Sequence, residues 1–235
     1  MSSDNILKAY EKRKQQQAVA EYFFTYNSFA YLFMQQERER VMLKLLYKFG
    51  FHSLANMRIL DIGCGNGNGL REFLQWGSVP KNLSGIDIRP EPIERASLLN
   101  PTIDYRCTDA TNLPWEAESF DLCLCYTVFS SVPDDSAQEA IAEEIRRILS
   151  PGGILVWYDF KYNNPRNTDV RGVAKQRIKE LFPDFKILAL RKVTLLPPLA
   201  HRLGILTPLL YPALSSSPFL RTHYLGILQK PFLKI

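Results

Sequence analysis

The stretch Ile59-Leu60-Asp61-Ile62-Gly63-Cys64-Gly65-Asn66-Gly67 decides the fold of this chain. A short apolar run carries an acidic side chain near its end, and three glycines follow at alternate positions. Glycine lets the backbone turn tightly and lets a ligand approach the main chain closely. A strand, a glycine-rich turn and a helix in this order are typical of nucleotide-type sites in α/β proteins. By itself, however, such a turn is a weak signal.

Around this stretch, apolar runs alternate with helical segments from residue 57 to residue 160. Further runs lie at 83–88, 103–107, 120–129 and 154–158. The run 120–129 is almost continuously apolar, which is typical of a strand covered on both faces. The turn Pro151-Gly152-Gly153 is predicted to lead into the last run. Alternating strands and helices with short connections predict right-handed crossovers and a doubly wound sheet.

The two ends of the chain are less regular. Residues 4–50 are predicted to be helical, with Gly50 ending the helix. Beyond residue 160 we expect a helix at 169–182, a strand at 185–196 and a final strand at 224–229, the two strands forming an antiparallel hairpin at the sheet edge. We therefore divide the chain into an N-terminal helical cap, residues 1–50, and a main domain, residues 51–235, with a variable insertion at about 195–220.

Composition sets limits on the class of protein. The chain has 235 residues, 46% of them hydrophobic, and a formal net charge of +5, which is ordinary for a globular domain. Basic residues do not alternate with aromatic ones as in a nucleic-acid strip. The four cysteines lack the spacing of a metal site, so we expect no metal and reduced, buried thiols. No signal pattern and no apolar run of spanning length occur, which predicts a cytoplasmic protein.

Acidic residues at the ends of the next strands make the glycine turn more specific. Asp87 ends the run Gly85-Ile86-Asp87-Ile88, where a carboxylate can accept hydrogen bonds from both hydroxyls of a ribose. Asp109 follows the third strand in Thr108-Asp109-Ala110, where a carboxylate can receive an amino proton of adenine. Several such features in the right order are much more specific than any one of them.

These residues resemble class I S-adenosylmethionine-dependent methyltransferases, especially the bacterial small-molecule group, over roughly residues 57–160. The resemblance implies a Rossmann-like seven-stranded sheet, mostly parallel with one antiparallel strand, and S-adenosylmethionine as cofactor. It implies that Asp61 holds the cofactor amino group, that Asp87 holds the ribose and that Tyr126 lies near the transferred methyl. The full set that it implies for cofactor binding is Asp61, Gly63, Cys64, Gly65, Gly67, Asp87, Ile88, Asp109, Ala110 and Tyr126.

Three alternatives stay open. A dinucleotide-binding oxidoreductase would show Gly-x-Gly-x-x-Gly, whereas the spacing here is Gly63-x-Gly65-x-Gly67. A non-catalytic protein of the same fold would bind the cofactor without turning it over. An RNA methyltransferase is disfavoured, because Tyr126-Thr127-Val128-Phe129 stands where amino-methylating enzymes of nucleic acids carry an Asn/Asp-Pro-Pro-Tyr-like motif.

The segment 157–167 is dense in aromatic and hydrogen-bonding side chains and follows the fifth predicted strand, at the edge where ligands bind in open sheets. It resembles a Tyr-Asp-Phe-x-Tyr-Asn-Asn-Pro run of a bacterial methyltransferase subgroup. Substrate contact and a plain turn-rich loop are equally weighted readings of this segment. The candidate substrate-binding residues are Tyr158, Tyr162, Asn163, Asn164 and Arg166.

A general base can remove a proton from an oxygen or nitrogen acceptor, and the candidates are Asp159, His201 and His223. No obligatory catalytic triad is expected, because alignment of an activated methyl with its acceptor supplies much of the rate. We expect transfer of a methyl group to an oxygen, or less readily a nitrogen, of a small molecule such as a glycan precursor or natural product.

Two apolar segments bear on the partners of the chain. Aromatic residues cluster between Tyr22 and Phe33, where they could cover the cofactor or simply pack in the core. The Pro- and Leu-rich stretch 195–214 could form a wall for a hydrophobic acceptor or a patch that touches a membrane, although its prolines argue against an amphipathic surface helix. We expect a monomer or homodimer without nucleic acid or a transmembrane segment, and with peripheral membrane contact as an open alternative.

Overall fold

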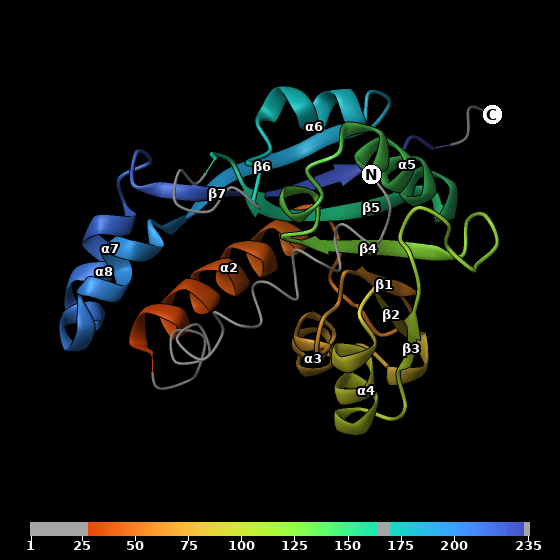
Figure 1. Cartoon of the computed structure of the whole chain (residues 1–235), viewed down its shortest axis with the longest axis horizontal. Helices are drawn as coiled ribbons and strands as arrows, with labels where there is room; N and C mark the ends of the chain where they lie inside the picture. Colours follow the sequence, from red (N-terminus) through yellow and green to blue (C-terminus); the bar gives the residue numbers. More distant parts are fainter. Residues whose placement is uncertain (1–27, 164–169, 233–235) are drawn as a thin grey trace.

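The computed structural model describes residues 28–163 and 170–232, and its centre is a seven-stranded sheet (Figure 1). The strand order is β3-β2-β1-β4-β5-β7-β6. Strand β7 runs antiparallel to β5 and β6, and the other pairings are parallel. The predicted doubly wound sheet with one antiparallel strand is confirmed. The strands are β1 (Ile59–Ile62), β2 (Leu83–Asp87), β3 (Asp104–Cys107), β4 (Phe120–Tyr126), β5 (Leu149–Phe160), β6 (Lys186–Leu195) and β7 (Arg221–Gln229).

Helices cover both faces of this sheet. On one face, α5 and α6 pack against alternate residues of β1, β4 and β5, with Trp157 at the centre. On the other face, α2 and α3 pack against the intervening residues, with Met42 and Phe73 fully buried. Because both faces are covered, β4 and β5 are apolar on both sides, as their sequences indicate. The helices of these layers and of the sheet edge are α2 (Phe29–Lys48), α3 (Asn68–Gln75), α4 (Pro90–Leu99), α5 (Asp135–Ile148) and α6 (Lys175–Leu181).

Several boundaries differ from the expectations: β4 ends at Tyr126 rather than at residue 129, and β7 begins at Arg221 rather than at residue 224. The helix predicted from residue 169 begins only at Lys175, because the segment before it hydrogen-bonds to other parts of the chain: Arg171 N–H donates to the Ser130 carbonyl and Val173 N–H to the Phe160 carbonyl. The expected turn at Pro151-Gly152-Gly153 is part of β5, which begins at Leu149 and changes register against β4 there. Of the four thiols, Cys107 is exposed rather than buried.

The insertion between β6 and β7 is helical. It contains α7 (Pro197–Arg202), the 3-10 turn η3 (Gly204–Leu206) and α8 (Thr207–Ser215), and it forms the far left end of the molecule in Figure 1. Pro197 and Pro208 lie in the first turns of their helices, where the missing N–H breaks no hydrogen bond. The segment is therefore helical despite its prolines, with Pro212 inside α8, and the expectation that it forms no amphipathic surface helix stays a prediction.

Helix α2 connects this insertion to the sheet. Its first half packs on α7 and α8 through Ala30 and Met34, which share a cluster with Tyr211. Glu37 is buried, and its Oε2 accepts hydrogen bonds from the Tyr211 hydroxyl at 2.7 Å and from the Thr194 N–H at 3.1 Å. One carboxylate thus ties α2, β6 and α8 together. The division into a cap and a main domain at residue 50 stays a prediction, and residues 1–27 lie outside the described part.

Replacement of Glu37 by Ala removes the acceptor of two buried donors. We expect Glu37→Ala to lower the free energy of unfolding by about 2–4 kcal/mol, because both donors lose a charged partner in the core. Urea denaturation of the full chain measures this loss. Gln36→Ala on the exposed side of the same helix is the matched control and should change stability little; an equal loss in both variants would contradict the role of Glu37.

Candidate functional site

The glycine turn after β1 is shaped by its backbone. Gly63, Gly65 and Gly67 have φ values of 69°, 51° and 77°, in the left-handed region. A Cβ at Gly67 would also collide with the Tyr105 hydroxyl. Gly69, in the first turn of α3, has a different reason to be glycine, because a Cβ there would lie 2.7 Å from Oδ2 of Asp61. The sequence therefore brings the start of α3 against the buried carboxylate of Asp61.

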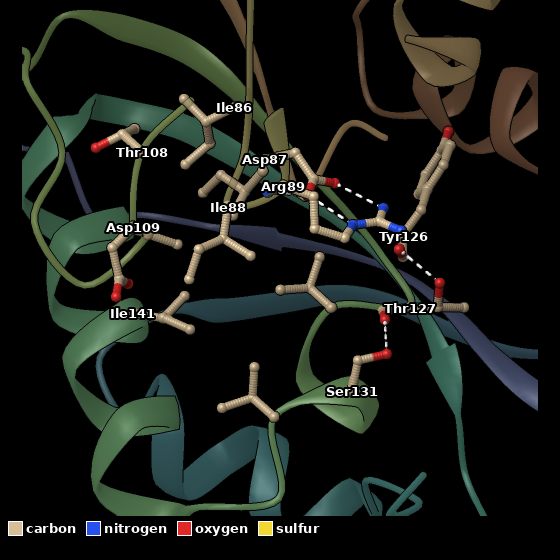
Figure 2. Close-up of a pocket in the computed structure, with 15 residues that line it drawn as sticks. Ile86, Asp87, Ile88, Arg89, Thr108, Asp109, Tyr126, Thr127, Ser131 and Ile141 are labelled. Atoms are coloured by element: carbon tan, nitrogen blue, oxygen red, sulfur yellow. Dashed lines mark hydrogen bonds and ion pairs between the residues drawn. The ribbon is translucent and has the colours of Figure 1, made fainter. Parts of the chain in front are cut away.

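A pocket opens at the carboxyl edge of the sheet, beside this turn. Figure 2 shows Asp87 and Ile88 after β2, Asp109 after β3 and Tyr126 at the end of β4, all bordering the same space. Gly63 and Ala110 line it as well. Six of the ten residues expected to bind the cofactor thus meet in one pocket. Asp61, Cys64, Gly65 and Gly67 are not among its lining residues. The sequence did not single out Thr108, Thr127, Val128, Ser131, Val132 and Ile141, which also line it.

The Asp87 carboxylate is held from two sides. Oδ2 accepts the Gly65 N–H at 3.0 Å, which joins the glycine turn to the end of β2. The guanidinium of Arg89 donates to Oδ1 at 3.0 Å and to Oδ2 at 3.1 Å, as the dashed lines in Figure 2 show. A bidentate pair of this kind is among the stronger polar contacts in proteins. A ribose that uses Asp87 must therefore share this carboxylate with Arg89 or displace it.

At the other end of the turn, charged groups are buried together. Arg38 of α2 forms an ion pair with Glu72 of α3, and both side chains are nearly inaccessible. Burial raises the pKa of Glu72 to about 7, although Arg38 opposes this shift. Burial, followed by the negative charges of Glu72 and Asp87, also raises the pKa of Asp61 well above its ordinary value. Two carboxylates therefore share one cation in a region shielded from water.

Aromatic rings enclose this charged group. The Arg38 guanidinium lies 4.6 Å from the centroid of Tyr126 and 5.4 Å from that of Tyr158, within the range of cation–π contacts. The two rings meet edge to face at 5.8 Å. Tyr158 also stacks on His223 at 4.7 Å. Strands β4, β5 and β7 thus contribute a continuous row of rings next to Arg38.

The three candidate bases lie in different surroundings. Asp159 is buried on the face of α5, and its oxygens accept the N–H groups of Ser130 and Phe160. Burial raises its pKa to about 6. Burial, with the charges of Arg38 and Lys161, lowers the pKa of His223 to about 3. His201 lies on α7, where its Nδ1 is 3.4 Å from the Ser28 hydroxyl.

Of these three candidates, His223 is the one whose ring stacks on Tyr158. A base works best with a pKa near the working pH, which counts against His223, and the Asp159 oxygens already accept two main-chain hydrogen bonds. All three assignments stay predictions.

The candidate substrate residues do not share one surface. Tyr158 is buried among the rings described above, whereas Tyr162 is mostly exposed and lies over the Lys161 ammonium at 4.3 Å. Oδ1 of Asn163 accepts a hydrogen bond from the Gly172 N–H. This contact is what a turn-rich loop would show, which was the alternative to substrate binding. Asn164 and Arg166 lie outside the described residues. Contact of these side chains with a substrate stays a prediction.

The buried charges fit the amino-acid end of S-adenosylmethionine. Nε of Arg38 and Oε2 of Glu72 are buried without a hydrogen-bond partner, and Asp61 lies beside them. A free donor next to free carboxylate acceptors suits a ligand that carries both a carboxylate and an ammonium group. Arg38, Glu72 and Arg89 were not predicted from the sequence as site residues. The first two lie on separate helices with no motif, but Arg89, two residues after Asp87, could have been noticed.

Comparisons with known proteins identify a methyltransferase domain in the same part of the chain. A family model described as a methyltransferase domain matches residues 60–157. The chain is 30% identical over 140 residues to phthiotriol/phenolphthiotriol dimycocerosates methyltransferase 1 of Mycobacterium ulcerans, a match that covers 56% of this chain and 48% of that protein. It is 31% identical to 2-methyl-6-phytyl-1,4-hydroquinone methyltransferase of Synechocystis sp., covering 52% of this chain and 38% of that protein. The matched part thus spans about half the length of these relatives, or less.

Among solved structures, the fold is similar to that of the N-methyltransferase NodS from Bradyrhizobium japonicum in complex with S-adenosyl-L-homocysteine. The TM-score is 0.62 at 21% sequence identity, and the match covers 84% of this chain and 88% of that one. At this identity the likeness speaks for the fold alone. The ordered site residues, the matched family model and the curated relatives together carry the assignment. Residues 60–157 match the methyltransferase domain, and together with the fold this match supports a class I S-adenosylmethionine-dependent methyltransferase.

Proposed function

We propose that the protein transfers a methyl group from S-adenosylmethionine to an oxygen, or less readily a nitrogen, of a small molecule. The observation that carries this proposal is the meeting of Gly63, Asp87, Asp109 and Tyr126 in one pocket. The buried group of Arg38, Glu72 and Asp61 supports it, because its free donor and acceptors match a zwitterionic ligand. The bound cofactor would supply an activated methyl group on a sulfonium centre.

In this proposal each part of the site has one task. Asp87 and the Gly65 main chain hold the ribose, and Asp109 with Ile88 and Ala110 holds the adenine. Arg38 pairs with the cofactor carboxylate, while Asp61 and Glu72 pair with its ammonium group. The rings of Tyr126 and Tyr158 border the sulfonium, whose positive charge aromatic faces stabilise. The chain then has to align the acceptor and exclude water, which accounts for much of the rate in such transfers.

The acceptor is proposed from chemistry rather than from a motif. The two curated relatives are named for methylation of phthiotriol dimycocerosates and of a phytyl hydroquinone, both largely apolar molecules. An apolar cluster of α2, α7 and α8 is connected to Tyr158 through Thr194 and Glu37. Both observations favour an acceptor with a substantial apolar part, such as a natural product with a hydrocarbon portion, over a bare sugar. A glycan precursor with a lipid carrier is compatible with this class.

The ribose assignment predicts a loss of affinity in Asp87→Ala. We expect cofactor binding to weaken by about 1–3 kcal/mol, because charged hydrogen bonds to the hydroxyls disappear. Isothermal titration calorimetry with S-adenosylhomocysteine measures the change. Asp104→Ala is the matched control, since Asp104 is an exposed carboxylate at the start of β3 that pairs with Arg106. Unchanged affinity in Asp87→Ala would contradict the ribose assignment.

The raised pKa of Glu72 predicts that cofactor affinity depends on pH. A carboxyl group with a pKa near 7 is protonated below that pH and cannot pair with an ammonium group. Affinity should therefore rise with pH up to about 7, by at most about tenfold per pH unit, and then level off. Glu72→Gln should flatten this rise, whereas Glu94→Gln on the exposed side of α4 should not. An equal pH dependence in Glu72→Gln and wild type would contradict the role of Glu72.

Methyl transfer itself is tested with methyl-labelled cofactor and small-molecule extracts separated into lipid and water-soluble fractions. We expect label to appear in the lipid fraction and to be lost in Asp87→Ala. Failure of the wild type to bind cofactor at high micromolar concentration would overturn the proposal. Tight binding without label in either fraction would favour the alternative of a non-catalytic protein of this fold.

A further inference from the structure

The insertion between β6 and β7 exposes an unusual amount of apolar surface. Ile205 is 83% exposed, Leu209 75% and Phe219 89%, and together they occupy η3, α8 and the segment that follows. We call the following set the apolar end surface. It consists of Leu196, Ile205, Leu206, Leu209, Leu210 and Phe219, with Phe29 and Leu32 of the adjoining start of α2.

These side chains are not needed to hold the insertion in place. Its inner side is already closed by Ala200 and Tyr211, which pack on Ala30 and Met34 of α2. The Tyr211 hydroxyl is fixed by Glu37. The helices therefore have one packed face and one apolar outer face. Contiguous apolar surface on a folded domain marks a site of interaction with a protein, a ligand or a membrane.

The charge of the last 50 residues, which include the insertion, is strongly one-sided. Residues 186–235 contain seven of the 29 Lys and Arg residues and none of the 24 Asp and Glu residues of the chain. The rest of the chain holds 22 basic and 24 acidic residues, so the positive net charge comes from this last segment. Arg202 on α7 is exposed, as are Arg191 and Lys192 on the edge strand β6, which contacts α7 and α8.

The exposed apolar side chains and the excess of positive charge together favour one binding partner. We infer that the apolar end surface docks onto an anionic lipid bilayer. Ile205, Leu209 and Phe219 enter the boundary between headgroups and acyl chains, and Arg202 and Lys192 contact the lipid phosphates. Exposed apolar side chains flanked by cations, with no acidic residue between them, are what such a surface binds.

A second copy of the chain fits this surface less well. A symmetric dimer would place the acid-free surface against itself, so like charges would face each other. None of the described helices is long and apolar enough to cross a bilayer. The contact is therefore peripheral, and it combines shallow insertion of side chains with attraction between opposite charges.

Vesicle flotation of the full chain tests the inference. The probes are vesicles of phosphatidylcholine alone and of phosphatidylcholine with phosphatidylglycerol. We expect binding to the anionic vesicles only, weakened by high salt, since exposed charges are screened. Ile205→Ser/Leu209→Ser should reduce the partition coefficient at least about tenfold, because two apolar side chains no longer enter the bilayer. Lys192→Glu and Arg202→Glu should each reduce it about fivefold or more.

Matched controls stand at the far end of the sheet. Leu98→Ser removes an apolar side chain of α4 that is 84% exposed, and Lys81→Glu reverses an exposed charge near β2. Both should bind vesicles like the wild type. The inference is overturned if the wild type binds neither kind of vesicle, or if the controls lose as much binding as the docking variants. It is also overturned if sedimentation equilibrium shows a dimer that Ile205→Ser/Leu209→Ser dissociates, because the surface is then an interface between copies.

Discussion

The buried ion pair between Arg38 and Glu72 is the contact on which the site depends. It joins α2 to α3, and it lies against Tyr126 and beside Asp61 at the carboxyl edge of the sheet. Buried charges are costly unless they are paired and hydrogen-bonded. Here the pairing is incomplete, because one donor of Arg38 and one acceptor of Glu72 have no partner. A ligand with a carboxylate and an ammonium group would complete both.

Helix α2 links this site to the remote end of the molecule. Two adjacent residues on it point to different partners, Glu37 to α8 and β6 and Arg38 to α3. The same helix therefore contacts the insertion through Glu37 and the charged group beside Tyr126 through Arg38. If the insertion docks on a bilayer, α2 joins the surface that meets the lipid to the region where an apolar acceptor would meet the methyl group. Hydrogen bonds and close packing, rather than flexible loops, carry this connection.

Sequence patterns predicted the central sheet well because alternation and glycine spacing are local properties. Asp61, Asp87 and Asp109 end neighbouring parallel strands, and the carboxyl ends of such strands meet at one edge. Predictions of secondary structure failed where long-range contacts outweighed the local preference for a helix. The segment before Lys175 is not helical, because the main-chain N–H groups of Arg171 and Val173 donate hydrogen bonds to η2 (Phe129–Ser131) and β5. Pro197 and Pro208 of the insertion did not prevent helices because they fall in first turns, whereas Pro212 lies inside α8.

By itself, the sequence determined the class of fold, the order of the residues expected to face the cofactor and the basic, acid-free character of the last fifty residues. These features follow from the periodicity of hydrophobic residues, from the backbone conformations that favour glycine and from composition, none of which depends on tertiary contacts. Only the tertiary structure decided that Arg38 pairs with Glu72, that Glu37 meets Tyr211 across a separation of 174 residues, and that Arg89 holds Asp87. The periodicity of a helix predicts which of its side chains are buried. Which other side chains they contact depends on how separate helices and strands pack against each other.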